Sequence, residues 1–79
     1  MVFNVFDKLT DEITTFVKRR YPWVKSCYRA SSGAWGIIST LIREGKLRDY
    51  KREGNRYIIE TEHGILVDDE SYEQLFFCT

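Results

Sequence analysis

Lysine and arginine side chains are concentrated in the stretch LIREGKLRDYKREGNRYII, which covers residues 41–59. The cationic residues of this stretch are Arg43, Lys46, Arg48, Lys51, Arg52 and Arg56. Such cations displace the counterions that surround nucleic-acid phosphates, so a cluster of them favours contact with a polyanion. The alternative is that the stretch forms a solvated edge of an ordinary small domain.

The charges of the chain are segregated along its length, although they cancel overall. Residues 1–17 hold one base against three acids, a net of −2. Residues 18–56 hold eleven bases against three acids, a net of +8, and residues 57–79 hold six acids and no base, a net of −6. This asymmetry points to a polyanion partner on one face. Mutual neutralisation of the two blocks within the fold explains it equally well.

No combination of residues predicts catalysis or a metal site. His63 is the only histidine, and no cysteine lies near it in the predicted turn EHG, whereas a zinc site needs several such ligands. Asp68, Asp69 and Glu70 lack the spacing of a calcium loop. The chain has no phosphate loop and no nucleophile elbow. We therefore expect a protein that binds rather than an enzyme, with no catalytic residue, metal or cofactor.

Three helices are expected within residues 4–44. Apolar residues at helical spacing predict an amphipathic helix over residues 5–20 and a second over about 32–44, which ends at Gly45. The segment 22–30 fits either a helix that starts at Pro22 or a short strand, and we favour the helix. The residues expected to be buried are Phe6, Ile13, Phe16, Ile37, Ile38, Leu41 and Tyr57.

After Gly45 the pattern predicts strands. Segments 46–51 and 56–61 flank a loop with Gly54-Asn55 at its tip, which is typical of an antiparallel hairpin. A third short strand is expected at 65–67, after the turn EHG, and a final helical turn through YEQLFF. Three helices followed by a basic hairpin predict an α+β fold, a small winged helix-turn-helix in a single domain over residues 1–79.

The segment LIREGKLRDYK…GNRYII resembles the helix end and wing of excisionase-like and MerR-like winged helix-turn-helix domains. The matching residues are Leu41, Ile42, Gly45, Lys46, Leu47, Gly54, Arg56, Tyr57 and Ile59. The resemblance covers about residues 31–76. The chain departs from the family pattern at SSGA, where a Gly-Val-Ser turn is usual, and at the inserted TEHGILVD. The resemblance implies sequence-specific binding of double-stranded DNA by a transcription regulator or an excisionase-type recombination directionality factor.

If the chain binds DNA in this way, residues 32–44 form the recognition helix and residues 46–56 the wing. Ser39, Thr40 and Arg43 would then face base edges, and Ser32 would hold a phosphate at the start of the helix. The wing would meet phosphates or the minor groove through Lys46, Arg48, Lys51, Arg52 and Arg56.

The rival hypothesis is a protein-interaction module or an inhibitor that docks on an acidic surface of a partner protein. Net neutrality and the acidic C-terminal third favour it. The sequence leaves the oligomeric state open, a homodimer included. The start of the chain has no signal-peptide pattern, and no segment approaches the ~18 apolar residues that span a membrane. We expect a cytoplasmic protein in which Cys27 and Cys78 are reduced, half-buried thiols rather than a disulfide.

Overall fold

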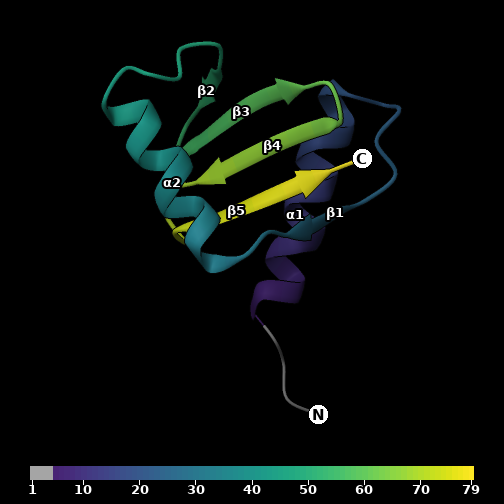
Figure 1. Cartoon of the computed structure of the whole chain (residues 1–79). Helices are drawn as coiled ribbons and strands as arrows, with labels where there is room; N and C mark the ends of the chain where they lie inside the picture. Colours follow the sequence, from purple (N-terminus) through teal and green to yellow (C-terminus); the bar gives the residue numbers. More distant parts are fainter. Residues whose placement is uncertain (1–4) are drawn as a thin grey trace.

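The computed structural model describes the backbone of residues 5–79 and the side chains of residues 8–31 and 33–79. It contains two helices and one five-stranded antiparallel sheet with the strand order β1-β5-β4-β3-β2 (Figure 1). In chain order the elements are α1 (Val5–Arg20), β1 (Cys27–Arg29), α2 (Ser32–Arg43), β2 (Lys51–Glu53), β3 (Arg56–Thr61), β4 (Gly64–Asp69) and β5 (Gln74–Cys78).

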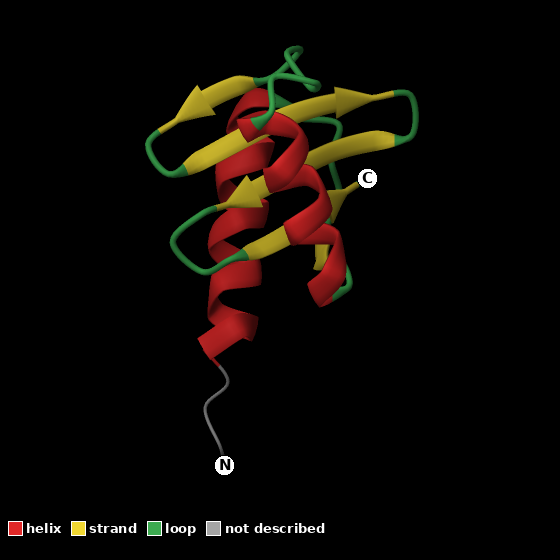
Figure 2. Cartoon of the chain, turned by 60° about the vertical axis from the view of Figure 1, so that its left-hand side comes forward, coloured by secondary structure: helices red, strands yellow, loops and turns green. Residues whose placement is uncertain are grey.

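The sheet is the middle layer of three, with α1 on one side and α2 on the other (Figures 1 and 2). Side chains alternate between the two sides of a strand, so the neighbours of each helix can be read from the register. Leu9, Ile13 and Val17 of α1 form the main core with sheet residues that share one side. These sheet residues are Cys27, Ile58, Ile65, Val67, Phe76 and Cys78.

The other side of the sheet packs against α2, which contacts mainly β4 and β5. Tyr57, Ile59 and Leu75 are buried on this side. One cross-strand row runs Tyr28, Phe77, Leu66, Ile59, and the next contains Leu75, Asp68 and Tyr57. The sheet is therefore covered on both sides, which explains why β4 and β5 read as nearly continuous apolar runs.

The predicted winged helix-turn-helix is wrong, because two of its expected helical segments are not helical. The segment 22–30 forms a turn at Pro22 and Trp23 and then β1, whose three residues pair with β5. The favoured helix fails because Val24 and Cys27 complete the core under α1, and an extended chain places them there. The alternative of a short strand is the correct one.

The C-terminal segment YEQLFF was also misassigned. Residues 70–73 form a turn, with Glu73 at a φ of 51°, and Gln74–Cys78 form β5 between β1 and β4. Leu75 and Phe76 point to opposite sides of the sheet, and both are buried. Because both sides are covered, the strand lacks the polar alternation that would have distinguished it from a helix.

Several local predictions are confirmed. The helices at 5–20 and 32–43 form, and Gly45 follows the second one with a φ of +71°, the left-handed conformation of a helix C′ residue. The hairpin forms around Gly54 and Asn55, although only residues 51–53 pair as its first strand. The third strand forms and extends beyond residues 65–67 to Gly64–Asp69.

The predicted core is partly correct. Ile13 and Tyr57 are buried, and Phe16, Ile38 and Leu41 are half-buried. Ile37 is 64% exposed, because the sheet covers only one side of α2 and Ile37 lies on the other. The Phe6 side chain lies outside the described residues.

Cys27 and Cys78 form a disulfide, which corrects the expectation of reduced thiols. The two residues lie directly opposite each other in the β1–β5 pair, with Cα atoms 4.1 Å apart. Their separation of 51 residues hid this proximity, because β1 and β5 are neighbours only in the folded sheet. Neither helix within residues 5–79 is long and apolar enough to cross a membrane.

Candidate functional site

The outward side of α2 is unusually apolar for an exposed helix. Arg43 is the only charged residue among the twelve of α2. Residues at spacings of three and four share one face of a helix, and here that face carries Gly33, Gly36, Ile37 and Thr40. Exposed helices normally carry charged residues on the face that meets water. We call these four residues the α2 outer face.

The two glycines of the α2 outer face have no packing role within the described chain. A Cβ atom built at Gly33 or at Gly36 meets no atom within 4 Å. Glycine inside a helix destabilises it by about 1 kcal/mol relative to alanine. Relief of crowding against another element, the usual structural reason for such a glycine, therefore does not apply. The glycines leave open space beside the helix, so another molecule can approach its backbone closely.

Apolar side chains are also exposed on the sheet on the same side as α2. Tyr28 of β1 is 54% exposed and packs edge-to-face against Phe77, with ring centroids 5.7 Å apart. Phe77 and Leu66, its neighbour in β4, are half-buried. The α2 side of the molecule thus exposes an aliphatic and an aromatic side chain from different elements.

Basic side chains gather where α2 ends. Arg43, Lys46 and Arg48 lie on the last turn of α2 and the loop that follows, and all three are exposed. Arg43 Nη2 donates to Thr40 Oγ1 at 3.3 Å, and Arg48 Nε donates to the Gly45 carbonyl at 2.9 Å. Lys46 forms an exposed ion pair with Glu44 at 3.1 Å. We call Arg43, Lys46 and Arg48 the basic corner.

Arg52 lies on the same side of the sheet as α2. It is opposite Tyr57 in the register, and its guanidinium carbon lies 5.4 Å from the Tyr57 ring centroid. The Glu70 carboxylate beside the Tyr57 hydroxyl, together with burial, raises the pKa of Tyr57. Arg43, Arg48 and Arg52 make no ion pair with a carboxylate of the described side chains. Their positive charge is therefore available to an external partner.

The other two predicted wing residues face α1 instead. Lys51 Nζ lies 3.1 Å from Glu60 Oε1, and Tyr21 donates to the same oxygen at 2.6 Å. These two donors lower the pKa of Glu60. Arg56 is paired with Asp69 at 3.1 Å. The structure thus divides the predicted wing between the two sides of the sheet, since successive strand residues point in opposite directions.

The residues predicted to read bases are not presented together. Ser39 is buried against the sheet, and Thr40 is half-buried and accepts the bond from Arg43. The side chain of Ser32, the first residue of α2, lies outside the described residues. Of the nine predicted site residues, Arg43, Lys46 and Arg48 are exposed at the end of α2 and in the loop that follows it, and Thr40 contacts Arg43. The α2 outer face was missed, although the single charge in α2 was a usable signal for it.

A buried carboxylate beneath α2 was also missed. Asp68 is 0% exposed, and neither of its oxygens has a hydrogen-bond partner among the described residues. The Trp35 indole N–H above it is likewise buried without a bond of acceptable geometry. Burial raises the pKa of Asp68 to about 6, against the opposing effect of the Trp35 N–H. A buried carboxylate is costly, so Asp68 marks a weak point beneath α2.

Comparisons with protein-family models, with curated proteins and with solved structures give no match for this chain. The described side chains also contain no group of three or more histidine, cysteine, aspartate or glutamate residues that could hold a metal ion.

Proposed function

We propose that this protein is a protein-binding module whose α2 outer face docks on a partner. The observation that carries the proposal is the pair of glycines beside Ile37, which lowers helix stability with no compensation within the described chain. An exposed apolar centre with a charged rim is the usual composition of a protein interface. Here the centre is Ile37 and the rim is the basic corner.

The partner surface that fits this arrangement is acidic around an apolar patch. Arg43 and Arg48 are exposed and have no carboxylate partner in the described chain, so their charges would be complemented on docking. Such complementarity raises the association rate and fixes the orientation of the partner. An inhibitor that covers an acidic site of its target is one form of this activity.

Site-specific photocrosslinking in the cells that produce the protein tests the proposal. A benzophenone amino acid at position 37 should give one crosslinked protein of defined mass. The same group at Glu62, which is exposed in the β3–β4 turn, serves as the matched control and should not. Replacement of both Arg43 and Arg48 by Glu should abolish the crosslink from position 37. Equal crosslinking from both positions, or none from position 37, would contradict the proposal.

Double-stranded DNA is the second candidate partner, and the exposed Arg43, Arg48 and Arg52 favour it. The winged-helix resemblance implied a recognition helix and a wing, and the structure has neither arrangement. The DNA candidate is therefore limited to contacts between these arginines and phosphates, without reading of bases. Three neutralised phosphates predict a slope of about −2.7 in log K against log salt concentration. A retardation gel with random duplex at low salt decides, since the absence of a shifted band excludes this candidate.

A further inference from the structure

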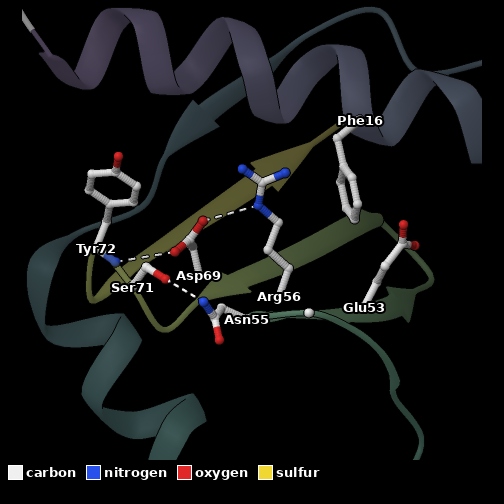
Figure 3. A pocket seen from close by; sticks show the side chains of 8 residues that line it. Phe16, Glu53, Asn55, Arg56, Asp69, Ser71 and Tyr72 are labelled. Atoms are coloured by element: carbon white, nitrogen blue, oxygen red, sulfur yellow. Dashed lines mark hydrogen bonds and ion pairs between the residues drawn. The ribbon is translucent and has the colours of Figure 1, made fainter.

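Arg56 lies in a hollow on the α1 side of the sheet, away from the α2 outer face. The hollow has a volume of about 360 Å³ and lies between α1, the β2–β3 turn and the β4–β5 turn (Figure 3). Phe16, Glu53, Asn55, Ser71 and Tyr72 line it together with Arg56. The docking activity proposed above uses none of these side chains.

The Arg56 guanidinium is held in place on two sides. Its Nε donates to Asp69 Oδ2 at 3.1 Å, and Asp69 Oδ1 accepts the backbone N–H of Tyr72 at 3.2 Å. Asp69 is only 2% exposed, so this pair is largely shielded from water. The Phe16 ring lies 4.9 Å from the guanidinium carbon. An arginine fixed in this way loses little conformational entropy when it binds a ligand.

The donors that remain on Arg56 are accessible. Its two terminal nitrogens carry no hydrogen bond to the described chain, and the side chain is 24% exposed. Figure 3 shows these nitrogens at the end of the side chain, directed toward α1. Two parallel N–H groups of a guanidinium match the two oxygens of one oxyanion. Nearby, Ser71 Oγ accepts a bond from Asn55 Nδ2 at 2.8 Å, which leaves its own hydroxyl proton free to donate.

The charge around the hollow selects among oxyanions. The positive charge of Arg56 is paired with the negative charge of Asp69. Glu53, which lines the hollow, is paired with Arg20, whose guanidinium carbon lies 4.2 Å from the Phe16 ring centroid. The four charges cancel, so the site has no excess positive charge to hold a dianion. A singly charged carboxylate meets the same donor pair with less repulsion from Glu53.

We propose that the Arg56 hollow is a binding site for a carboxylate group attached to an apolar or aromatic body. The carboxylate accepts the two terminal N–H groups of Arg56, and its apolar body packs against Phe16 and the exposed Tyr72. A free organic acid and the terminal carboxylate of a peptide share this chemistry.

Amide chemical-shift titration of the full-length chain at constant ionic strength tests the site. Benzoate should shift residues 54–56 and 70–72 saturably, whereas benzamide, its neutral counterpart, should not. N-acetylphenylalanine and its amide form the matching pair for the terminal carboxylate of a peptide. If benzoate binds more tightly than N-acetylphenylalanine, the natural ligand is a free organic acid, and the reverse order indicates a peptide terminus. Phenyl phosphate should bind more weakly than benzoate. Equal shifts by benzoate and benzamide, or tighter binding of phenyl phosphate, would overturn the proposal.

A variant that keeps the positive charge at position 56 distinguishes specific binding in the hollow from general attraction between an anion and a cation. Arg56→Lys retains the cation beside Asp69 but loses the paired donors, so benzoate affinity should fall roughly tenfold while the amide spectrum stays that of a folded protein. Arg43→Lys, on α2 at the opposite side of the sheet and with no contact to the hollow, should bind benzoate as the wild type does. Benzoate affinity that is the same in Arg56→Lys as in the wild type would also overturn the proposal.

Discussion

Among the described side chains, Asp68 is the residue whose buried environment conflicts most with its negative charge. Its carboxylate is buried between the sheet and α2 without a hydrogen bond to the described side chains or backbone. Burial favours its neutral form, and the negative charges of Glu70 and Asp69 act in the same direction. The folded protein therefore holds the Asp68 proton more tightly than the unfolded chain does.

Asp68→Asn should stabilise the protein at neutral pH. A pKa raised from 3.8 to about 6 makes the wild type lose stability as pH rises through that interval. Above it the loss amounts to about 3 kcal/mol, at 1.36 kcal/mol per pH unit. The free energy of unfolding of Asp68→Asn should exceed that of the wild type at pH 7, and the difference should shrink toward pH 4. Urea melts across this pH range measure it.

Asp49→Asn provides the control, because Asp49 is exposed in the loop before β2. This substitution should leave the free energy of unfolding nearly unchanged across the same interval. A matching pH-dependent gain in both variants would show that the effect is not specific to the buried site.

Arg56→Met should destabilise the protein by about 3 kcal/mol, because it leaves the buried Asp69 carboxylate without its cation. Adding Asp69→Asn to the same chain should recover most of that loss, since the neutral amide no longer needs a counter-charge. Chemical denaturation of both variants measures the difference. If the double variant lost as much stability as the sum of the losses caused by Arg56→Met alone and Asp69→Asn alone, Arg56 and Asp69 would not be energetically coupled.

At the scale of elements, Gly33 and Gly36 lower the stability of α2 and leave its outer face open. Gly33→Ala and Gly36→Ala should each raise the free energy of unfolding by about 0.5–1 kcal/mol, because both sites are helical and have space for a methyl group. The photocrosslink from position 37 should weaken in the same variants. Thermal unfolding, together with the crosslinking yield, tests both parts.

Gly64 is the contrasting glycine. A Cβ atom there would lie 2.4 Å from the Cys78 carbonyl oxygen, and its φ is +154°. Gly64→Ala should therefore destabilise the β4–β5 pair, unlike the two substitutions in α2. A stabilising effect at all three positions would show that packing does not distinguish them.

The two helices also differ in what their isoleucines contribute. Ile13→Ala in α1 should cost about 2–5 kcal/mol, because Ile13 is fully buried under the sheet. Ile37→Ala in α2 should cost less than about 0.5 kcal/mol of stability, as expected at an exposed position. Equilibrium urea unfolding of the two variants compares them, and similar losses would mean that α2 is covered in solution.

These elements show where sequence patterns are informative. The two helices, the hairpin at Gly54 and the strand at 65–67 follow from local periodicity and turn residues. Residues 22–30 and 72–77 were misassigned because each segment becomes a strand only by pairing with the other. They form β1 and β5, which pair although most of the chain lies between them in the sequence. Arg43 was predicted on a recognition helix, and Lys46 and Arg48 on a wing. The division of Lys51 and Arg56 from Arg52 could not be predicted, because it required the strand register. The Arg56–Asp69 pair, and so the hollow, likewise depends on pairing between β3 and β4.

For the whole molecule, the Cys27–Cys78 disulfide joins the edge strand β1 to the inner strand β5. Closing a loop of this length restricts the unfolded chain and is expected to contribute about 4 kcal/mol. Reduction should therefore lower the melting temperature markedly, and the denatured, unreduced protein should show no free thiol. Replacement of both cysteines by serine should reproduce the effect of reduction. A full count of two free thiols would contradict the bond.

The position of β5 between β4 and β1 also sets an order for folding. Strands β2 to β5 follow one another along the chain with short turns, so they can pair at little cost in loop closure. Strand β1 has no strand partner until β5 is in place, and the pairing of the two strands joins residues about fifty positions apart. Long-range pairing of this kind is slow relative to local pairing. In pulsed hydrogen exchange during refolding of the reduced chain, in which no disulfide holds β1 near β5, amides of β3 and β4 should gain protection before those of β1. Strand β1 is then the last strand to join the sheet.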